Sequence, residues 1–464
     1  MHFSLSLFLF FTYIYTRPQV NFPGDADIYF MQSDKSMKTY YLATLGCPKN
    51  EVDSETIESD LLSAGMSPCN DASEADLVIL NSCGFIADAK IESINSILSL
   101  HQERKRDSIL VLCGCLPARY NLTKSLNEVD IFLPWDKHDQ LIPRLQEIGL
   151  KVNKSTDTVK RLIPTAGFAY LKISEGCDNR CAYCAIPDIK GLFRSYPASK
   201  LIDEAQFLCD NGARELIIIG QDTTLYGHDA FGGESLPALI NNLAEIDECQ
   251  WIRLMYTHPA HLDDETIASI AENPKVVKYI DLPLQHINSR LLKLMRRKVD
   301  RADIESLINK LRDRISGIVL RTTFIVGFPG ETDDEFSELL DYCEMTQFDN
   351  IGIFKYSPEE GTPAYDLAGH LDDEIIEERY LTLLDIQNIV SESKLKRHIN
   401  QQERILVEKV ELDGTGYGRA WFQAPEVDGQ TIINKCDAKP GQFVDAIIER
   451  SDAYDLFARQ LQRG

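Results

Sequence analysis

Short apolar runs alternate with amphipathic stretches in the first third of the chain. Residues 39–45, 75–80 and 109–112 have the composition of buried strands, and residues 53–64 and 85–99 have apolar side chains at helical spacing. Strand, helix, strand, helix, strand is the order of an open parallel α/β sheet. In such a sheet, functional groups gather beyond the carboxyl ends of the strands.

The middle of the chain continues this alternation over a longer stretch. Helices are predicted over residues 198–211 and, with many charges, over residues 372–397. Strands are predicted over residues 169–173, 215–219, 251–256, 276–282, 318–325 and 350–356. About six parallel strands separated by helices predict a partial or full (β/α) barrel with its chemistry at the carboxyl face.

The pattern changes near residue 399. Short strands separated by turn residues predict a small, OB-like antiparallel barrel. These strands are expected at residues 404–410, 419–423, 430–434 and 443–449. Residues 151–166 show no periodicity and are predicted to be a linker. The chain therefore divides into five parts. They are an extension (1–36), a first α/β domain (37–150), the linker (151–166), the central domain (167–398) and the terminal barrel (399–464).

The first sixteen residues are apolar, but they do not have the pattern of a signal peptide. No Lys or Arg precedes Arg17, and the stretch is shorter than the roughly 20 residues of a spanning helix. We favour Met37 as the true start, with residues 1–36 outside any folded domain. The alternative is a genuine membrane-associating extension.

Composition and charge limit the partners. The chain has 464 residues, of which 44% are hydrophobic and 26% charged, and its net charge is −24. Such a charge disfavours broad attraction to nucleic acid, which requires Lys and Arg to neutralise phosphates. Residues 401–464 contain 8 Lys or Arg against 11 Asp or Glu, so even the small terminal barrel is acidic. Small barrels of this kind often bind RNA, but a basic protein is an equally plausible partner for this one.

Three cysteines lie close together in the run from residue 175 to residue 184. Cys177, Cys181 and Cys184 are spaced to hold three corners of a [4Fe-4S] cluster and to leave one iron open to a ligand. The alternative is a zinc site, which would need a fourth ligand. The nearest candidates, Cys209 and His138, are distant in sequence. Free thiolates also indicate a reducing compartment.

A second set of three cysteines follows the three strands predicted near the start of the chain. Cys47, Cys83 and Cys115 each come directly after a strand, so they should converge at one edge of the sheet. This predicts a second cluster site. Cys113 lies inside the third strand, and we expect it to be a buried core residue instead.

Two further segments lie at the predicted carboxyl face of the central domain. Residues 323–331 form a strand that enters a glycine-containing turn, where the backbone at Gly327 could approach a cofactor closely. An ordinary strand-to-helix turn explains this segment equally well. Another strand ends near Gln285 and His286, and for His286 we expect a structural role.

With these motifs in place, residues 37–464 resemble the methylthiotransferases of the radical S-adenosylmethionine (SAM) superfamily. The stretches 44–50, 81–86 and 114–120 are similar to the auxiliary-cluster domain of that family, and 172–187 to its radical-SAM loop. The last segment is similar to a TRAM domain. Within the family, the chain is more similar to the branch that modifies ribosomal protein S-12 than to the tRNA-modifying branch. That similarity lies in the stretches 220–227, 282–286, 356–363 and 423–429.

The resemblance implies a mechanism with two [4Fe-4S] clusters. One cluster cleaves SAM to a 5'-deoxyadenosyl radical, which removes hydrogen from the β-carbon of an aspartate of S-12, and the second cluster supplies the sulfur. The catalytic role belongs to the six cluster cysteines. The resemblance also implies a SAM pocket in which Tyr183 packs on the adenine; its other expected residues are Gly220, Gln221, Gln285 and Gly327.

The resemblance and the charge together define the expected partners. We expect S-12, free or within the small ribosomal subunit, and a low-potential electron donor such as flavodoxin or ferredoxin. We expect a cytoplasmic location, no membrane contact and no direct nucleic-acid substrate. A tRNA adenosine methylthiotransferase with the same two-cluster chemistry is the alternative, and a non-catalytic protein carrying two clusters is a third reading.

Overall fold

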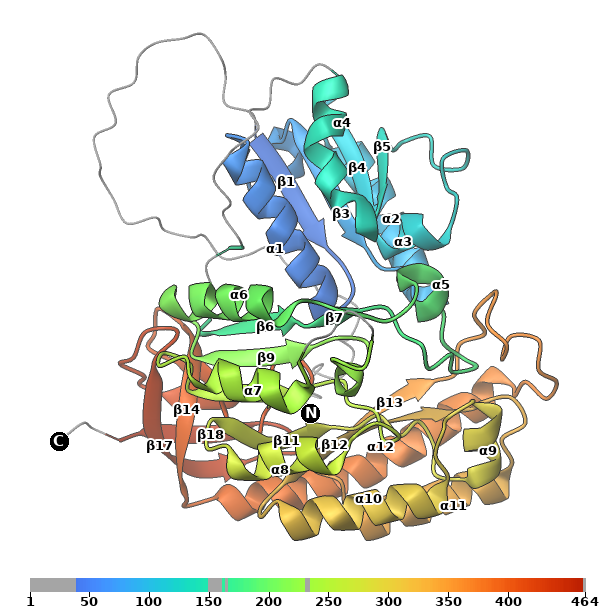
Figure 1. Ribbon diagram of the computed structural model, residues 1–464, viewed down its shortest axis with the longest axis vertical. Helices are drawn as coiled ribbons and strands as arrows, with labels where there is room; N and C mark the ends of the chain where they lie inside the picture. The colour runs from blue at the N-terminus through green and yellow to red at the C-terminus, as the bar shows by residue number, and fades with distance from the viewer. Residues whose placement is uncertain (1–38, 149–160, 163–165, 230–233, 462–464) are drawn as a thin grey trace. The chain divides into compact units, whose positions relative to one another are not determined.

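The computed structural model describes residues 39–148, 161–162, 166–229 and 234–461 (Figure 1). The chain forms two compact units. Unit 1 comprises Met1–Leu162 with Asp188–Lys190, and unit 2 comprises Ile163–Pro187 with Gly191–Gly464. The predicted extension and most of the predicted linker lie outside the described residues.

Unit 1 contains a five-stranded sheet in the order β2-β1-β3-β4-β5, in which every neighbouring pair is parallel. Its strands are β1 (Thr39–Thr44), β2 (Ser67–Pro68), β3 (Leu77–Ser82), β4 (Ile109–Gly114) and β5 (Ile131–Pro134). The prediction of an open parallel α/β sheet is therefore confirmed. The edge strands β2 and β5 were not predicted, because they are too short to show a clear apolar pattern.

Helices cover both faces of this sheet (Figure 1). Along β3, Ile79 belongs to one apolar core, whereas Val78 and Leu80 belong to the other, since successive side chains in a strand point to opposite faces. The first core is covered by α1 (Pro48–Ser63) and α4 (Leu141–Glu147). The second is covered by α2 (Ala87–Glu103) and α3 (Cys115–Arg119).

Unit 2 is built on a six-stranded parallel sheet in the order β13-β12-β11-β10-β9-β6. The strands are β6 (Phe168–Lys172), β9 (Glu215–Ile219), β10 (Trp251–Leu254), β11 (Val276–Asp281), β12 (Val319–Val326) and β13 (Asn350–Lys355). Because β6 and β13 are the two ends of the sheet and do not pair with each other, the barrel is partial, in agreement with the predicted six strands.

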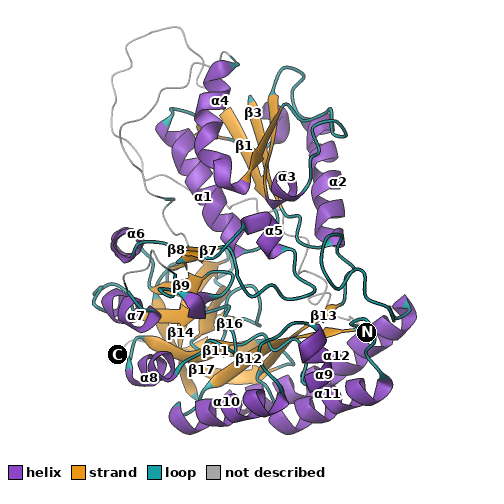
Figure 2. Cartoon of the chain, turned by 45° about the vertical axis from the view of Figure 1, so that its right-hand side comes forward, coloured by secondary structure: helices purple, strands orange, loops and turns teal. Residues whose placement is uncertain are grey.

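Amphipathic helices pack around this sheet (Figure 2). Two of them begin with capping boxes, Asp300 with Asp303 and Thr332 with Glu335, in which each side chain binds the backbone N–H of the other residue. The helices are α6 (Ala198–Asp210), α7 (Leu236–Ala244), α8 (Asp264–Glu272), α9 (Ser289–Leu294), α10 (Arg301–Arg314), α11 (Asp333–Thr346) and α12 (Asp373–Leu395). The two helices predicted in this region, corresponding to α6 and α12, are found within about two residues of their expected bounds.

The end of unit 2 is a closed five-stranded barrel in the order β14-β15-β16-β18-β17. Its strands are β14 (Gln402–Val410), β15 (Gly416–Ala420), β16 (Thr431–Asn434), β17 (Phe443–Ser451) and β18 (Leu456–Gln460). The predicted small barrel is confirmed. Its strands pair antiparallel except β16 with β18, which is parallel, and β18 was not predicted.

Within the described residues, no helix is long and apolar enough to cross a membrane.

Candidate cluster sites and cofactor pocket

The three-cysteine loop of unit 2 follows β6 and the short strand β7 (Ser174–Glu175), which pairs with β8 (Arg194–Ser195). Gly176 precedes Cys177 with a φ of +76°, and a Cβ there would lie 2.1 Å from the Leu192 carbonyl oxygen. Only glycine fits this position. The Cys184 N–H donates to the Cys181 carbonyl at 3.1 Å, so the loop closes into a turn that gathers its thiols.

Electrostatic coupling shows that these thiols lie near one another. Burial and then the neighbouring Cys181 raise the pKa of Cys184, a backbone hydrogen bond lowers it, and Cys177 raises it further. Burial raises the pKa of Cys177 to about 11, although hydrogen bonds from Asn179 lower it. Deprotonating several buried thiols together requires a cation among them, as a metal cluster would provide. The donor set therefore fits an iron-sulfur cluster.

The second three-cysteine set lies at the carboxyl edge of the sheet in unit 1. Cys47 immediately precedes α1, Cys83 follows β3, and Cys115 begins α3. Gly114 has a φ of +97°, and a Cβ there would lie 2.3 Å from Asn81 Oδ1, so glycine is required for the chain to leave the strand at Cys115.

The second set also behaves as one electrostatic group. Burial raises the pKa of Cys83 to about 12, and Cys47 adds to this increase. For Cys115, burial again raises the pKa most, the Lys190 ammonium lowers it, and Cys83 and Cys47 raise it. Lys190 is buried and is balanced by Asp53, with 3.4 Å between Nζ and Oδ2. This set too fits a metal cluster.

Cys113 and Asn50 complete the description of this edge. Cys113 is buried in the core between the sheet and α1, where we expected it. Asn50 donates to the Leu45 carbonyl at 2.7 Å and accepts a hydrogen bond from Cys115 Sγ at 3.7 Å. Asn81 in turn donates to the Asn50 carbonyl at 2.8 Å. Asn50 thus ties together the three segments that carry the cysteines, a role that sequence reasoning missed.

The residues expected to line a SAM pocket all come from unit 2. Gly220 and Gln221 follow β9, and Gln285 follows β11 with a φ of +75°. Gly327 follows β12, and Tyr183 of the cluster loop packs beside an apolar cluster that contains Phe328. The topology thus brings these residues to the carboxyl edge of the six-stranded sheet.

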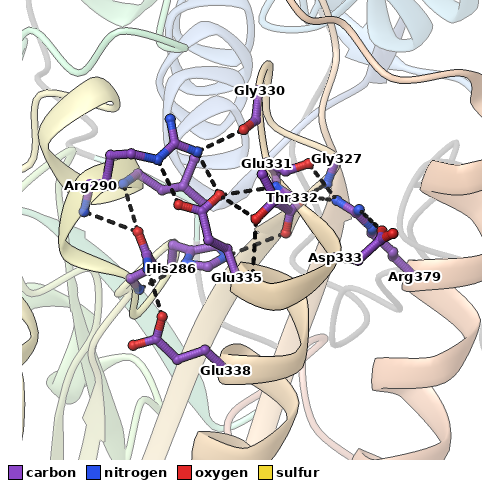
Figure 3. A network of polar contacts seen from close by, with 12 residues as sticks. His286, Arg290, Gly327, Gly330, Glu331, Thr332, Asp333, Glu335, Glu338 and Arg379 are labelled. Atoms are coloured by element: carbon purple, nitrogen blue, oxygen red, sulfur yellow. Dashed lines mark hydrogen bonds and ion pairs between the residues drawn. The ribbon is translucent and has the colours of Figure 1, made fainter.

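A buried polar network fixes the turn at Gly327 (Figure 3). One oxygen of Glu331 accepts a hydrogen bond from the Gly327 N–H at 2.5 Å. The same oxygen forms an ion pair with Arg379 at 2.9 Å. The other oxygen lies 3.2 Å from His286 Nε2. The second ring nitrogen of His286 accepts the Asn288 N–H at 2.9 Å. Both ring nitrogens of His286 contact protein groups, which is compatible with the structural role that we expect for it.

A second polar cluster adjoins the cluster loop, and sequence reasoning missed it. Asp222 Oδ2 accepts from Asn179 at 2.6 Å and lies 2.8 Å from His261 Nδ1. His258 stacks on His261, with ring centroids 4.7 Å apart. Burial and the positive charge of Arg297 lower the pKa of His258 to about 2, so its ring is neutral. The spacing of the two histidines, in the loop after β10, was the available signal.

Comparison with known families agrees with this arrangement. The radical SAM superfamily matches residues 171–343, the uncharacterized protein family UPF0004 matches residues 39–134, and the TRAM domain matches residues 399–461. A solved radical SAM methyltransferase, TsrM from Kitasatospora setae, has a similar fold, with a TM-score of 0.51 at 14% identity. That match covers 71% of this chain and 77% of TsrM. The fold and the cluster loop together define a radical SAM enzyme, for which an iron-sulfur cluster and SAM are the cofactors.

Curated relatives identify the family within this superfamily. Ribosomal protein uS12 methylthiotransferase RimO of Acetivibrio thermocellus is 40% identical, covering 89% of this chain and 96% of the relative. The RimO protein of Desulforamulus reducens is 41% identical, covering 92% of this chain and 100% of the relative. The RimO protein of Geotalea uraniireducens is 42% identical, covering 89% of this chain and 96% of the relative. The chain belongs to the RimO family of methylthiotransferases.

Proposed function

We propose that this enzyme adds a methylthio group to the β-carbon of a specific aspartate of ribosomal protein uS12. The observation that carries the proposal is the presence of two separate three-cysteine sites, one in each unit, each with its thiols electrostatically coupled. Methylthio transfer requires a radical source and a sulfur source. A radical SAM enzyme that needs only the radical would not need the second site.

The six cysteines are assigned to two [4Fe-4S] clusters. Cys177, Cys181 and Cys184 hold the cluster that binds SAM at its open iron, and the second cluster is held by Cys47, Cys83 and Cys115. When bound, the first cluster supplies the electron that cleaves SAM and so allows removal of hydrogen from the substrate carbon. The cofactors supply this chemistry, while the protein binds, orients and excludes water.

The chain's own residues shape the SAM pocket. Tyr183 packs on the adenine, and the backbone at Gly220 and Gly327 lines the pocket. A Cβ at Gly327 would lie 2.5 Å from Ile376 Cγ1, and one at Gly220 would lie 2.6 Å from Ser174 Oγ, so glycine is needed for this close packing of the pocket wall. Gln221 and Gln285 line the same pocket. In the described residues, Gln221 Oε1 is buried without a hydrogen-bond partner, while Nε2 donates to Glu175 at 2.6 Å, so one end of this amide is free for a ligand.

Charge favours a protein substrate over tRNA. In the acidic terminal barrel, several arginines already have partners within the chain. Arg419 is buried against Glu215, Arg459 pairs with Glu449 at 2.9 Å, and Arg450 lies over the ring of Phe457. A basic ribosomal protein suits this surface better. A tRNA substrate, the second candidate, would need a phosphate-binding surface with a steep salt dependence.

The remaining partners follow from the proposed chemistry. One-electron reduction at low potential requires a donor of the flavodoxin or ferredoxin class. All twelve cysteines are free, which supports a reducing compartment and hence action on uS12 in the cytoplasm.

Anaerobic reconstitution tests the proposal. The protein, loaded with iron and sulfide, is given SAM and a reductant and incubated in parallel with uS12, its loop peptide and tRNA. Mass spectrometry then detects methylthio addition. Modification of the aspartyl peptide alone supports the proposal. Modification of RNA instead overturns the substrate, and 5'-deoxyadenosine without either product leaves only the radical chemistry.

Alanine variants assign the two sites separately. Replacing Cys47, Cys83 and Cys115 together should leave SAM cleavage intact while abolishing transfer, whereas replacing the three loop cysteines should abolish both. The matched control is Cys113→Ala, a buried cysteine two residues from Cys115, which should keep both clusters and the activity. Loss of transfer in that control would contradict the assignment.

A further inference from the structure

The guanidinium of Arg297 is held against the cluster loop. The residue lies just beyond α9, and its backbone N–H donates to the Leu292 carbonyl at 2.8 Å. Nη1 lies 3.5 Å from Cys181 Sγ, and Nη2 donates to the Pro283 carbonyl at 2.6 Å. A second contact joins the same segments, because the Ala182 N–H donates to the Met295 carbonyl at 2.9 Å. The position of the guanidinium is therefore set from both sides.

The charge of Arg297 is buried, and no carboxylate in the described residues forms an ion pair with it, although the more distant charge of Asp222 helps to raise the pKa of the guanidinium. The residue is 8% exposed, and among the described residues none of its nitrogens lies in an ion pair. Nε is buried and also lacks a hydrogen-bond partner there. Isolated buried charges are costly in proteins and are normally compensated. The group in contact that can compensate this one is the sulfur of Cys181 in its thiolate form.

The cysteine site of unit 1 has a buried cation of its own, and the comparison is informative. Lys190 lowers the pKa of Cys115, but Asp53 lies 3.4 Å from its ammonium and cancels much of its charge. Arg297 has a direct contact with a cluster cysteine, and in the described residues no carboxylate forms an ion pair with it. Its charge should therefore act more strongly on the cluster that it faces.

We propose that Arg297, acting through Cys181, raises the reduction potential of the radical-SAM cluster and so makes its one-electron reduction accessible to the donor. The inference rests on the proposed assignment of Cys177, Cys181 and Cys184 to that cluster. The site gains one electron from a carrier of the flavodoxin or ferredoxin class, and no bond to Arg297 is made or broken. A fixed positive charge and a hydrogen bond to a cluster sulfur both favour the form with the extra electron. In a buried setting this effect is weakly screened.

The experiment measures the midpoint potential of the cluster by EPR-monitored titration without SAM. The full-length chain is used with Cys47, Cys83 and Cys115 replaced by alanine, so that the radical-SAM cluster alone gives the signal. Into this parent we introduce Arg297→Gln, Arg297→Lys and, as the matched control, Arg296→Gln, since Arg296 is the adjacent exposed arginine. Iron content is determined for each protein before the titration.

Arg297→Gln should lower the midpoint so that, at a fixed potential, the ratio of reduced to oxidised cluster falls at least tenfold, which is about 59 mV for a one-electron couple. Arg297→Lys keeps the charge but cannot contact Cys181 Sγ and the Pro283 carbonyl at the same time as the planar guanidinium does. The midpoint potential should therefore fall in this variant too, but by less than in Arg297→Gln. Arg296→Gln should leave the midpoint unchanged. A purely structural role for Arg297 would not move the potential of a fully loaded cluster.

A loaded Arg297→Gln protein with an unchanged or higher midpoint overturns the inference and leaves the proposed function standing. If Arg297→Gln binds no iron, Arg297→Lys decides: a lower midpoint supports the inference and an unchanged one overturns it. A parent protein that binds no iron overturns the cluster assignment, and the inference falls with it.

Discussion

Glu215 on β9 and Arg419 on β15 form an ion pair with 2.7 Å between Oε2 and Nη2, and both side chains are almost fully buried. The other oxygen of Glu215 pairs with Arg253 on β10, also at 2.7 Å. Arg253 in turn donates to the Trp421 carbonyl at 2.9 Å. These contacts tie the small terminal barrel to the six-stranded sheet, so the two form one compact unit.

Removing the charge of Glu215 should strongly destabilise unit 2. Glu215→Gln leaves two buried guanidinium groups without their shared carboxylate, and breaking a buried pair costs about 3–5 kcal/mol of unfolding free energy. Urea denaturation followed by circular dichroism measures the loss. The matched control is Glu449→Gln, which breaks the exposed pair with Arg459 and should cost less than about 1 kcal/mol. Equal effects of the two substitutions would contradict this account.

Weakening the Glu331 network should reduce SAM affinity. Glu331→Gln keeps the shape of the side chain but removes the charge that holds the Gly327 N–H and Arg379. Hydrogen bonds to charged groups contribute about 1.5–3 kcal/mol, so a rise in the Kd for SAM of roughly tenfold or more is expected if Gly327 lines the pocket. Equilibrium binding to the cluster-loaded protein measures it. Glu305→Gln, on the exposed side of α10, should leave the Kd unchanged.

Asn50 should be required for iron binding in unit 1 and dispensable for iron binding in unit 2. Asn50→Ala removes the hydrogen bonds to the Leu45 and Ser82 carbonyls, so the segments that lead into Cys47 and Cys83 lose their common tie. Reconstituted protein should fall from about eight to about four iron atoms per chain, the content of one [4Fe-4S] cluster. SAM cleavage should persist. Asn121→Ala, at an exposed position, serves as the control, and a loss of iron in that variant would contradict a specific role for Asn50.

The buried His258 should make stability depend on pH. Its pKa is lowered from 6.5 to about 2 by burial and by Arg297, so between these values the unfolded chain binds a proton that the folded chain does not. Stability therefore falls as pH drops below 6.5. Between pH 7 and pH 5, cluster-free wild type should lose about 2 kcal/mol more than His258→Asn. Urea denaturation at both pH values checks this, and His228→Asn, at an exposed position, should behave as wild type. An identical pH dependence of wild type and His258→Asn would refute the prediction.

The sequence by itself determined the architecture and the six candidate ligands. Apolar runs of strand length, separated by amphipathic helices, indicate a parallel sheet because hydrophobic periodicity reflects which face is buried. The short spacing of Cys177, Cys181 and Cys184 is a local property. Cys47, Cys83 and Cys115 could be grouped because each follows a strand, and parallel strands present their carboxyl ends at one edge.

The tertiary structure alone decided which polar side chains surround those sites. Arg297 meets Cys181 across 116 residues, and Glu215 meets Arg419 across 204. No periodicity connects such positions, because the pairing of buried charges depends on the angles at which loops and strands meet. The short strands β5 and β18 were missed for a related reason: their apolar runs are brief, and hydrogen bonding to neighbouring strands, not local pattern, holds them in the sheet.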